Sequence, residues 1–393
     1  MTDPIVITGI ARTAMGGFQG SLSTLTAAEL GAEAIKASVE RSGIDASDVQ
    51  EVIMGCVLPA GQGQAPARQA SLGAGMPLDA GCTTINKMCG SGMKATMLAH
   101  DLLVAGTNQV MVAGGMESMS NAPYLLPKVR DGLRMGHSQV MDHMFLDGLE
   151  DAYEKGKLMG SFAEMCADKY NFSREAQDNF AINSLKRAQE ATNSGAFAAE
   201  ITPVTVKTRK TEHVVDSDEQ PFNANIEKIP TLRPAFRKDG TVTAANASSI
   251  SDGAAALTMM RQSEAEKRGL TPIAVIRGHS TFAQEPAWFS TAPVDAMKQL
   301  LATLDWAPSD VDLYEINEAF AVVSMAAMHD LELDPEKVNV NGGACALGHP
   351  IGASGARILV TLIAALQQRK LKTGVAALCI GGGEATAMAV ELL

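Results

Sequence analysis

The seven residues NKMCGSG, numbered 86–92, place a cysteine between a short apolar run and a helical pattern. Apolar side chains then recur at helical spacing over residues 93–102, and Gly106 ends the pattern. Cys89 is therefore expected at or just before a helix N-terminus, where unpaired N–H groups and the helix dipole stabilise a thiolate. The neighbouring glycines permit a tight turn and leave space beside the sulfur. Such a cysteine is either a nucleophile or a small buried residue, and the remainder of the chain has to decide between them.

The composition is that of a tightly packed α/β enzyme. Of 393 residues, 46% are hydrophobic, 19% are charged and 36 are glycine, which excludes a disordered or fibrous chain. The length allows two or three domains. The formal net charge of −12 argues against a nucleic-acid or anionic-membrane partner, because either calls for a basic surface. An anionic small molecule is still compatible, since one local pocket is enough to bind it.

The six cysteines are scattered, and none forms a Cys-x-x-Cys pair, so a structural zinc site is not expected. Free thiols in a chain of this size are typical of a reducing compartment. The first residues lack the basic and apolar regions of a signal peptide, and no stretch approaches the roughly 20 apolar residues of a membrane span. These features predict a soluble cytoplasmic protein.

Short apolar runs alternate with helical patterns along most of the chain. Strands are expected at residues 5–9, 49–57, 83–85 and 110–113, and helices at 26–42, 64–75 and after Cys89. The alternation resumes with strands at 251–260, 273–277, 311–316 and 375–380 and helices at 293–304, 318–328 and 356–367. It predicts a mostly parallel sheet covered by helices on both faces.

Residues 121–243 differ from the flanking segments, because they combine several prolines with amphipathic helices and charged loops. We interpret them as an insertion over the sheet that supplies substrate contacts and excludes water. Glycine-rich turns also recur in the same order at 90–115 and at 341–383, each opening a helix that is followed by a strand and a glycine run. The repeat suggests two similar α/β halves, with the insertion carried by the first.

Three further chemically active positions stand at such turns. His349 precedes Pro350, which restricts the backbone of the histidine. Cys379 ends an apolar strand beside a glycine triplet, and Asn317 lies at a strand-to-helix turn. Each alone has an ordinary structural interpretation: a buried histidine, a strand cysteine or a helix cap.

In combination, these positions resemble the thiolase family. The matching strings are NKMCGSGMKA (86–95), GGMESMS (114–120), GTVTAANAS (240–248), INEAFA (316–321), NGGACALGHPIGASGAR (341–357) and CIGGG (379–383), in the family order. Within the family the chain is most similar to the acetyl-CoA acetyltransferase type. The resemblance implies an α/β thiolase fold, with two duplicated βαβαβαββ halves in a layered α/β/α/β/α core and an inserted loop domain. Residues 1–120, completed by about 244–270, would form the first half, 121–243 the loop domain over the active site, and 271–393 the second half.

The resemblance also implies a reaction, the reversible Claisen condensation of two acetyl-CoA to acetoacetyl-CoA and CoA through an acetyl-cysteine. Cys89 would be the nucleophile, His349 would take its proton and help to bind the thioester oxygen, and Cys379 would be the general acid/base at the α-carbon. Asn317 would hold a water that forms one oxyanion hole with His349. The N–H groups of Cys89 and Gly381 would form the other.

Acyl-CoA and free CoA are the expected partners, with CoA as a substrate. No cofactor and no metal are implied, because the cysteines and CoA carry the chemistry. Six positions match those that line the pantetheine channel in relatives: Leu149, Met159, Ala244, Ser248, Ala319 and Phe320. Residues 213–228 show no clear match to the adenine-binding segment. A homotetramer, built as a dimer of dimers, is expected from the assembly of relatives.

Three positions depart from the family pattern. Leu158 stands where relatives often have a histidine near the bound acyl-CoA, which removes a polar contact. Glu384 follows the glycine triplet where a small residue or methionine is common, and would face solvent or a subunit contact. Ser249 replaces a frequent glycine and is expected to narrow the pantetheine channel.

Three other functions have to be weighed against this one. Residues 90–95 fit the dinucleotide fingerprint, with Glu117 as the ribose-binding acid, which would make the chain a dehydrogenase. A catalytically idle acyl-CoA carrier would need neither thiol. A broader-chain 3-ketoacyl-CoA thiolase of fatty-acid β-oxidation would keep the same chemistry, because chain length depends on the shape of the insertion.

Overall fold

The computed structural model describes residues 3–209 and 211–393. Its main sheet is mixed, in the order β13-β14-β15-β12-β1-β11-β5-β3-β4, with β2 beside β11 and β8 beside β1. The strands of the first half are β1 (Ile5–Thr13), β3 (Glu51–Gly55), β4 (Gly81–Ile85), β5 (Val110–Ser118) and β11 (Ser251–Arg261), with the short β2 (Gly16–Gly17) and β8 (Ile201–Thr202). Those of the second half are β12 (Ala274–Ala283), β13 (Leu313–Ile316), β14 (Thr373–Ile380) and β15 (Glu384–Leu392).

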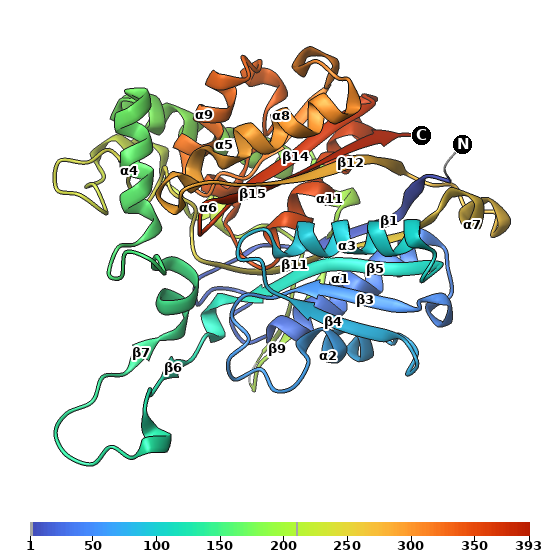
Figure 1. The fold of residues 1–393 in the computed structure, drawn as a ribbon, viewed down its shortest axis with the longest axis horizontal. Helices are drawn as coiled ribbons and strands as arrows, with labels where there is room; N and C mark the ends of the chain where they lie inside the picture. Colours follow the sequence, from blue (N-terminus) through green and yellow to red (C-terminus); the bar gives the residue numbers. More distant parts are fainter. Residues whose placement is uncertain (1–2, 210) are drawn as a thin grey trace.

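The two halves of the sheet meet where β1 lies beside β12. Two residue pairs join these strands, Val6 with Val275 and Ile7 with Ala274, whereas β1 pairs with β11 along most of its length. Figure 1 shows the consequence: β12, β14 and β15 lie in one layer and β11, β5, β3 and β4 in another.

Helices cover and separate the two strand layers. α1 (Ala27–Ser42) and α2 (Pro66–Gly73) pack against the first layer, and α8 (Ala292–Leu304) packs against the far side of the second. α3 (Ser91–Ala105) and α11 (Ser354–Arg369) lie between the layers and contact each other. The order of layers is α/β/α/β/α, which confirms the fold class. The remaining helices of the halves are α7 (Gln262–Lys267), α9 (Ala321–Asp330) and α10 (Ala344–Leu347).

The expectation of a mostly parallel sheet is wrong. β11 pairs antiparallel with β1 and β5, and β15 pairs antiparallel with β12 and β14. The strands of the parallel pairs β3–β4, β3–β5 and β13–β14 are connected through helices, and the short β8 also pairs parallel with β1. Continuous apolar runs are typical of parallel strands, which are buried on both faces. Here β1 and almost all of β11 are buried because helices cover both faces of an antiparallel centre.

Helix boundaries follow the expected end signals. The Thr26 hydroxyl and the Glu29 side chain form a capping box at the start of α1, and Gly43 ends it in the left-handed conformation. Gly106 ends α3 in the same way. The sequence analysis places no strand after Gly383, yet β15 lies between β14 and β12. Its small residues (EATAMAVEL) carry a weak apolar pattern.

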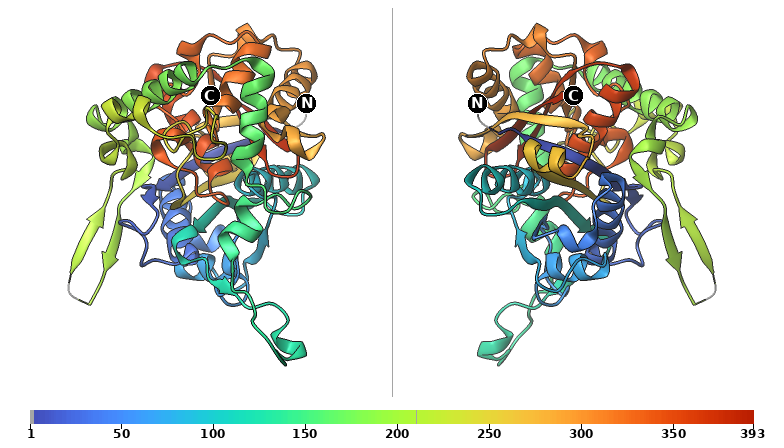
Figure 2. Two further views of the ribbon diagram at one scale, coloured as in Figure 1. Left: turned by 90° about the vertical axis from the view of Figure 1, so that its left-hand side faces the viewer. Right: turned by 90° about the vertical axis from the view of Figure 1, so that its right-hand side faces the viewer.

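The segment between β5 and β11 lies outside the layered core. It contains the hairpin of β6 (Tyr124–Leu125) and β7 (Met141–Asp142), α4 (Met159–Tyr170), α5 (Arg174–Asn193), the hairpin of β9 (Val204–Lys207) and β10 (Glu212–Val215), and α6 (Gln220–Asn223). Both hairpins extend away from the body of the molecule (Figure 2). Within the described part of the chain, no helix has the length and apolarity to cross a membrane.

Candidate active site

The N-termini of the two inner helices are in close contact. A Cβ atom on Gly92 would lie 2.7 Å from the backbone nitrogen of Ala356, and one on Gly355 would overlap the backbone nitrogen of Met93. Both contacts exclude a side chain, so this pair of glycines lets α3 and α11 approach so closely. The turn before α3 carries Cys89 and the turn before α11 follows His349. The contact between the helices therefore brings two predicted catalytic residues to one place.

Cys89, His349, Cys379 and Gly381 line one pocket of about 640 Å³. The six positions expected to contact CoA line it as well: Leu149, Met159, Ala244, Ser248, Ala319 and Phe320. Much of the remaining wall comes from residues 145–160 and 235–250, between β5 and β11. The structure thus brings together residues from both halves and from the insertion.

A strained turn holds Cys89 in the pocket. Met88 has a φ of 46°, in the left-handed region that side chains other than glycine rarely adopt. The Ser91 hydroxyl accepts a hydrogen bond from the Lys87 N–H (2.8 Å) and donates one to the Met88 carbonyl (2.6 Å). Helix α3 begins at Ser91, so Cys89 precedes the helix by two residues.

The same turn lies against the end of β14. A Cβ atom on Gly90 would overlap Cδ1 of Ile380, the residue that follows Cys379. Gly90 therefore allows direct contact between the turn that carries Cys89 and the end of β14, which carries Cys379. Lys87 forms an ion pair with Glu384, so this departure from the family pattern ties the start of β15 to the Cys89 turn.

Burial has the largest effect on the pKa values of both active-site thiols, those of Cys89 and Cys379. It raises the pKa of Cys89 to about 11, although the N–H groups of Gly381 and of Cys89 itself point at the sulfur and lower it. The N–H groups at this turn therefore stabilise the thiolate as expected, but desolvation outweighs them, so Cys89 is a neutral thiol in the free protein. Burial also raises the pKa of Cys379, and charge on Cys89 raises it further. A neutral thiol needs a base to become a nucleophile.

His349 has the hydrogen-bonding pattern of that base. The Ser354 hydroxyl donates to the Pro350 carbonyl (3.0 Å), so it accepts the hydrogen of His349 Nδ1 (2.6 Å). This arrangement leaves Nε2 with a free lone pair. Nε2 is buried and has no hydrogen-bond partner among the described residues. Burial, together with the charge of Arg357, lowers the pKa of His349 to about 3, so the imidazole is neutral.

Asn317 lies behind His349, with its Nδ2 3.5 Å from Nδ1 of the histidine. Its backbone N–H donates to the carbonyl of Ala377 on β14 (3.0 Å). Its Oδ1 is buried and unpaired within residues 3–209 and 211–393. An unpaired buried amide oxygen costs about 1–3 kcal/mol, so this position fits a water or another donor.

The sequence analysis missed two residues that hold the site together. Ser354 orients His349, and its place at the start of a helix five residues later was the available signal. The second is Glu117, which the sequence suggested only as a ribose ligand of a dehydrogenase. Its carboxylate accepts hydrogen bonds from the N–H groups of Val57 (2.9 Å), Leu58 (3.2 Å) and Gly352 (2.9 Å), the last of which lies in the His349 turn. An acid inside an apolar strand could have indicated this structural role.

The dinucleotide interpretation is wrong. Gly92 faces the N-terminus of α11, which fills the space that a pyrophosphate would need. Glu117 is fully buried and hydrogen-bonded to backbone, so it cannot reach a ribose.

The other two departures from the family pattern lie on the pocket wall. Leu158 replaces a polar group there with an aliphatic one. Ser249 lines the pocket and accepts a hydrogen bond from the His349 N–H through its carbonyl (3.1 Å). Aromatic residues that the sequence analysis did not single out complete this wall: Phe145, Tyr153, Phe236 and Phe289.

Comparison with known proteins identifies the class. The model of the thiolase N-terminal domain matches residues 5–263, and that of the thiolase C-terminal domain matches residues 270–392. The chain therefore belongs to the thiolase family. It is 51% identical to acetyl-CoA acetyltransferase 2 of Arabidopsis thaliana, over 99% of this chain and 97% of that protein. It is 49% identical to the acetyl-CoA acetyltransferase of Cupriavidus necator, over 100% of both chains.

Solved structures of similar proteins have the same fold. The Acat5 thiolase from Ascaris suum, in complex with coenzyme A, superposes with a TM-score of 0.94 at 42% identity, covering 99% of this chain and 100% of that one. The acetyl-CoA acetyltransferase of Bacillus anthracis gives a TM-score of 0.97 at 41% identity, covering 100% and 99%.

Proposed function

We propose that this chain is an acetyl-CoA acetyltransferase that condenses two acetyl-CoA molecules reversibly to acetoacetyl-CoA and CoA. The observation that carries the proposal is the meeting of Cys89, His349 and Cys379 at one pocket. Relatives that are about 50% identical over their whole length bear the name acetyl-CoA acetyltransferase, which supports the same activity here.

In the first half-reaction, the Cys89 sulfur attacks the thioester carbonyl of one acetyl-CoA. Nε2 of His349 accepts the thiol proton as the new C–S bond forms, because neither group is charged beforehand. The bond to the CoA sulfur then breaks, and His349 returns the proton to that sulfur. Free CoA leaves, and the acetyl group stays on Cys89.

In the second half-reaction, the Cys379 thiol first gives its proton to Nε2 of His349, and the resulting thiolate removes a proton from the α-carbon of a second acetyl-CoA. The carbanion attacks the carbonyl of the acetyl-cysteine, which forms the new C–C bond and breaks the bond to the Cys89 sulfur. That sulfur takes the proton from His349, so both cysteines end as thiols. The reverse reaction, thiolysis, uses Cys379 to protonate the same carbon. A thiol that is already buried suits this step, since it loses little solvation on approaching carbon.

Two groups of donors stabilise the oxygens that become negative. His349, once its Nε2 carries a proton, and a water held by Oδ1 of Asn317 form the first, which the unpaired state of that buried oxygen supports. The N–H groups of Cys89 and Gly381 form the second, which their direction toward the Cys89 sulfur supports. A donor of this kind contributes about 3–4 kcal/mol to transition-state stabilisation.

Coenzyme A is a substrate in this mechanism, and no metal or prosthetic group takes part. A solved relative is described as a complex with coenzyme A, which supports CoA binding at the pocket here. The loop domain, residues 121–243, covers the site in this proposal, since residues 145–160 and 235–236 line the pocket. Residues 1–120 with 244–270 and residues 271–393 form the two halves.

A homotetramer and a cytoplasmic location belong to the same proposal. The segment joining β6 and β7 extends from the body (Figure 1) and exposes Leu126, Leu133 and Met135, which a partner subunit would cover. All six cysteines are free thiols, as is usual in a reducing compartment.

The test is the kcat/KM for CoA-dependent thiolysis of acetoacetyl-CoA, measured beside that of a ten-carbon 3-ketoacyl-CoA. A strong preference for acetoacetyl-CoA supports the proposal. Equal or faster cleavage of the longer chain would make the protein a broader-chain thiolase and would contradict the proposed preference for acetyl groups. Cleavage of neither would leave an acyl-CoA carrier.

A further inference from the structure

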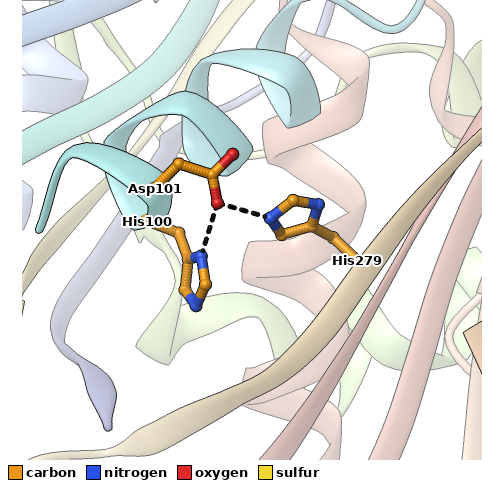
Figure 3. Close-up of side chains that lie close together, drawn as sticks. All are labelled: His100, Asp101 and His279. Atoms are coloured by element: carbon orange, nitrogen blue, oxygen red, sulfur yellow. Dashed lines mark hydrogen bonds and ion pairs between the residues drawn. The ribbon is translucent and has the colours of Figure 1, made fainter. Parts of the chain in front are cut away.

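A cluster of two histidines and an aspartate lies outside the pocket described above. His100 and Asp101 are adjacent on α3, and His279 lies in the middle of β12. The cluster therefore joins the inner helix of the first half to a strand of the second. Figure 3 shows both imidazole rings directed at the same carboxylate oxygen.

The distances are those of three ligand atoms that converge. Oδ1 of Asp101 lies 3.0 Å from Nδ1 of His100 and 3.0 Å from Nε2 of His279. All three atoms lie within 4.8 Å of one another, and the two rings meet edge to face at 5.1 Å between centroids. Adjacent residues on a helix normally point in different directions. The side chains of His100 and Asp101 nevertheless meet here, at the point that His279 also reaches.

We propose that His100, Asp101 and His279 bind a divalent first-row transition-metal ion of the Zn²⁺ type. Two imidazole nitrogens and one carboxylate oxygen form a ligand set that such ions favour, whereas Ca²⁺ and Mg²⁺ prefer sites made of oxygens. The ring hydrogens that now face Asp101 move to the other ring nitrogens by tautomer exchange. No metal was expected from the sequence, because the cysteines and CoA carry the chemistry and no Cys-x-x-Cys pair is present.

The two imidazole rings of the cluster are mostly buried, because the side chains of His100 and His279 are 19% and 20% exposed. Lys94, two turns earlier on α3, opposes a cation with its own positive charge. The site stays open to solvent, because the Asp101 side chain is 55% exposed.

The chain contains a matched control for this arrangement. His329 and Asp330 form the same adjacent pair at the end of α9, with Nδ1 2.8 Å from Oδ1. There the second partner of the carboxylate is the hydroxyl of Tyr170, which donates to the other oxygen, Oδ2 of Asp330, at 2.7 Å. A His–Asp pair alone should therefore bind no ion tightly, and His329→Asn tests that comparison.

The experiment is a titration of the full-length protein with Co²⁺, followed by visible absorption and by thermal unfolding. The wild type should bind one ion per chain with the spectrum of nitrogen and oxygen ligands and without thiolate charge-transfer bands. At an ion concentration of about 100 times Kd, Tm should rise by about 3 °C. His279→Phe, which keeps a ring, and Asp101→Asn should each weaken binding at least about 100-fold, and His329→Asn should not change it.

Several results would contradict the proposed metal site. They are no binding by the wild type, binding with a thiolate spectrum, or equal binding by the wild type, His279→Phe and Asp101→Asn. Unfolding curves in metal-free buffer show whether each variant is folded. If His279→Phe does not fold, the binding measured with Asp101→Asn decides the test.

Discussion

The tautomer of His349 is set by a single hydroxyl. Because the Ser354 hydroxyl is committed to the Pro350 carbonyl, it accepts from Nδ1 and leaves Nε2 free. Ser354→Ala removes that acceptor, so we expect kcat/KM to fall about 10–100-fold, in the range of other lost orienting contacts. Ser71→Ala is the control, since Ser71 is a buried serine on α2 without a partner for its hydroxyl in the described structure. Equal losses in both variants would contradict an orienting role for Ser354.

A neutral Cys89 thiol has a direct kinetic signature. With its pKa raised to about 11 by burial, about one molecule in ten thousand is a thiolate at pH 7. The rate of Cys89 alkylation by iodoacetamide, measured by peptide mass spectrometry, should rise about tenfold per pH unit from pH 7 to 9. A rate that levels off near pH 7 would instead indicate a thiolate stabilised by the helix N-terminus.

At the scale of elements, the site depends on the contact between the Cys89 turn and β14. A methyl group on Gly90 would overlap Cδ1 of Ile380, so Gly90→Ala should cost about 1–3 kcal/mol of unfolding free energy and reduce kcat. Ile380→Val removes that Cδ1 atom. The double variant should therefore recover part of both losses, measured by denaturant unfolding and thiolysis kinetics. Additive effects of the two substitutions would contradict a direct contact.

Local signals and long-range pairing differ in how far the sequence predicts them. Thr26 and Gly43 marked the ends of α1 because capping depends on residues a few positions apart. The direction of strand pairing was mispredicted, because the apolar runs of β1 and β11 report burial on both faces and not the orientation of a neighbour. β15 was missed for a related reason, since a strand of small residues lacks a strong period.

At the scale of the whole molecule, the residues of the pocket come from segments far apart in the chain. Cys89, His349, Cys379 and the six positions expected to contact CoA all line this pocket, and Asn317 lies behind His349. Contacts between the segments that carry these residues could not be read from spacing. Glu117 with Gly352 and Asp101 with His279 are such pairs. Each depends on how the two halves pack, which no local pattern records.

Glu117 also links the packing of these segments to pH. Burial raises its pKa from 4.5 to about 7 in the folded chain, so the folded state holds this proton more tightly than the unfolded state. Its contribution to stability is full below about pH 4.5 and is lost as pH rises to about 7, by about 3 kcal/mol. Glu117→Gln stays uncharged and should lack this loss, which denaturant unfolding from pH 4.5 to 7.5 would measure. Parallel curves for wild type and variant would exclude this linkage.

The most direct test of the proposed chemistry is the intact mass of the protein after incubation with acetyl-CoA. We predict one acetyl group on the wild type and on Cys379→Ala, and none on Cys89→Ala. Cys379→Ala should form the acetyl-enzyme yet release no acetoacetyl-CoA. Acetylation of Cys89→Ala to the wild-type extent, or a wild type that takes up no acetyl group, would contradict Cys89 as the nucleophile and with it the acetyltransferase mechanism.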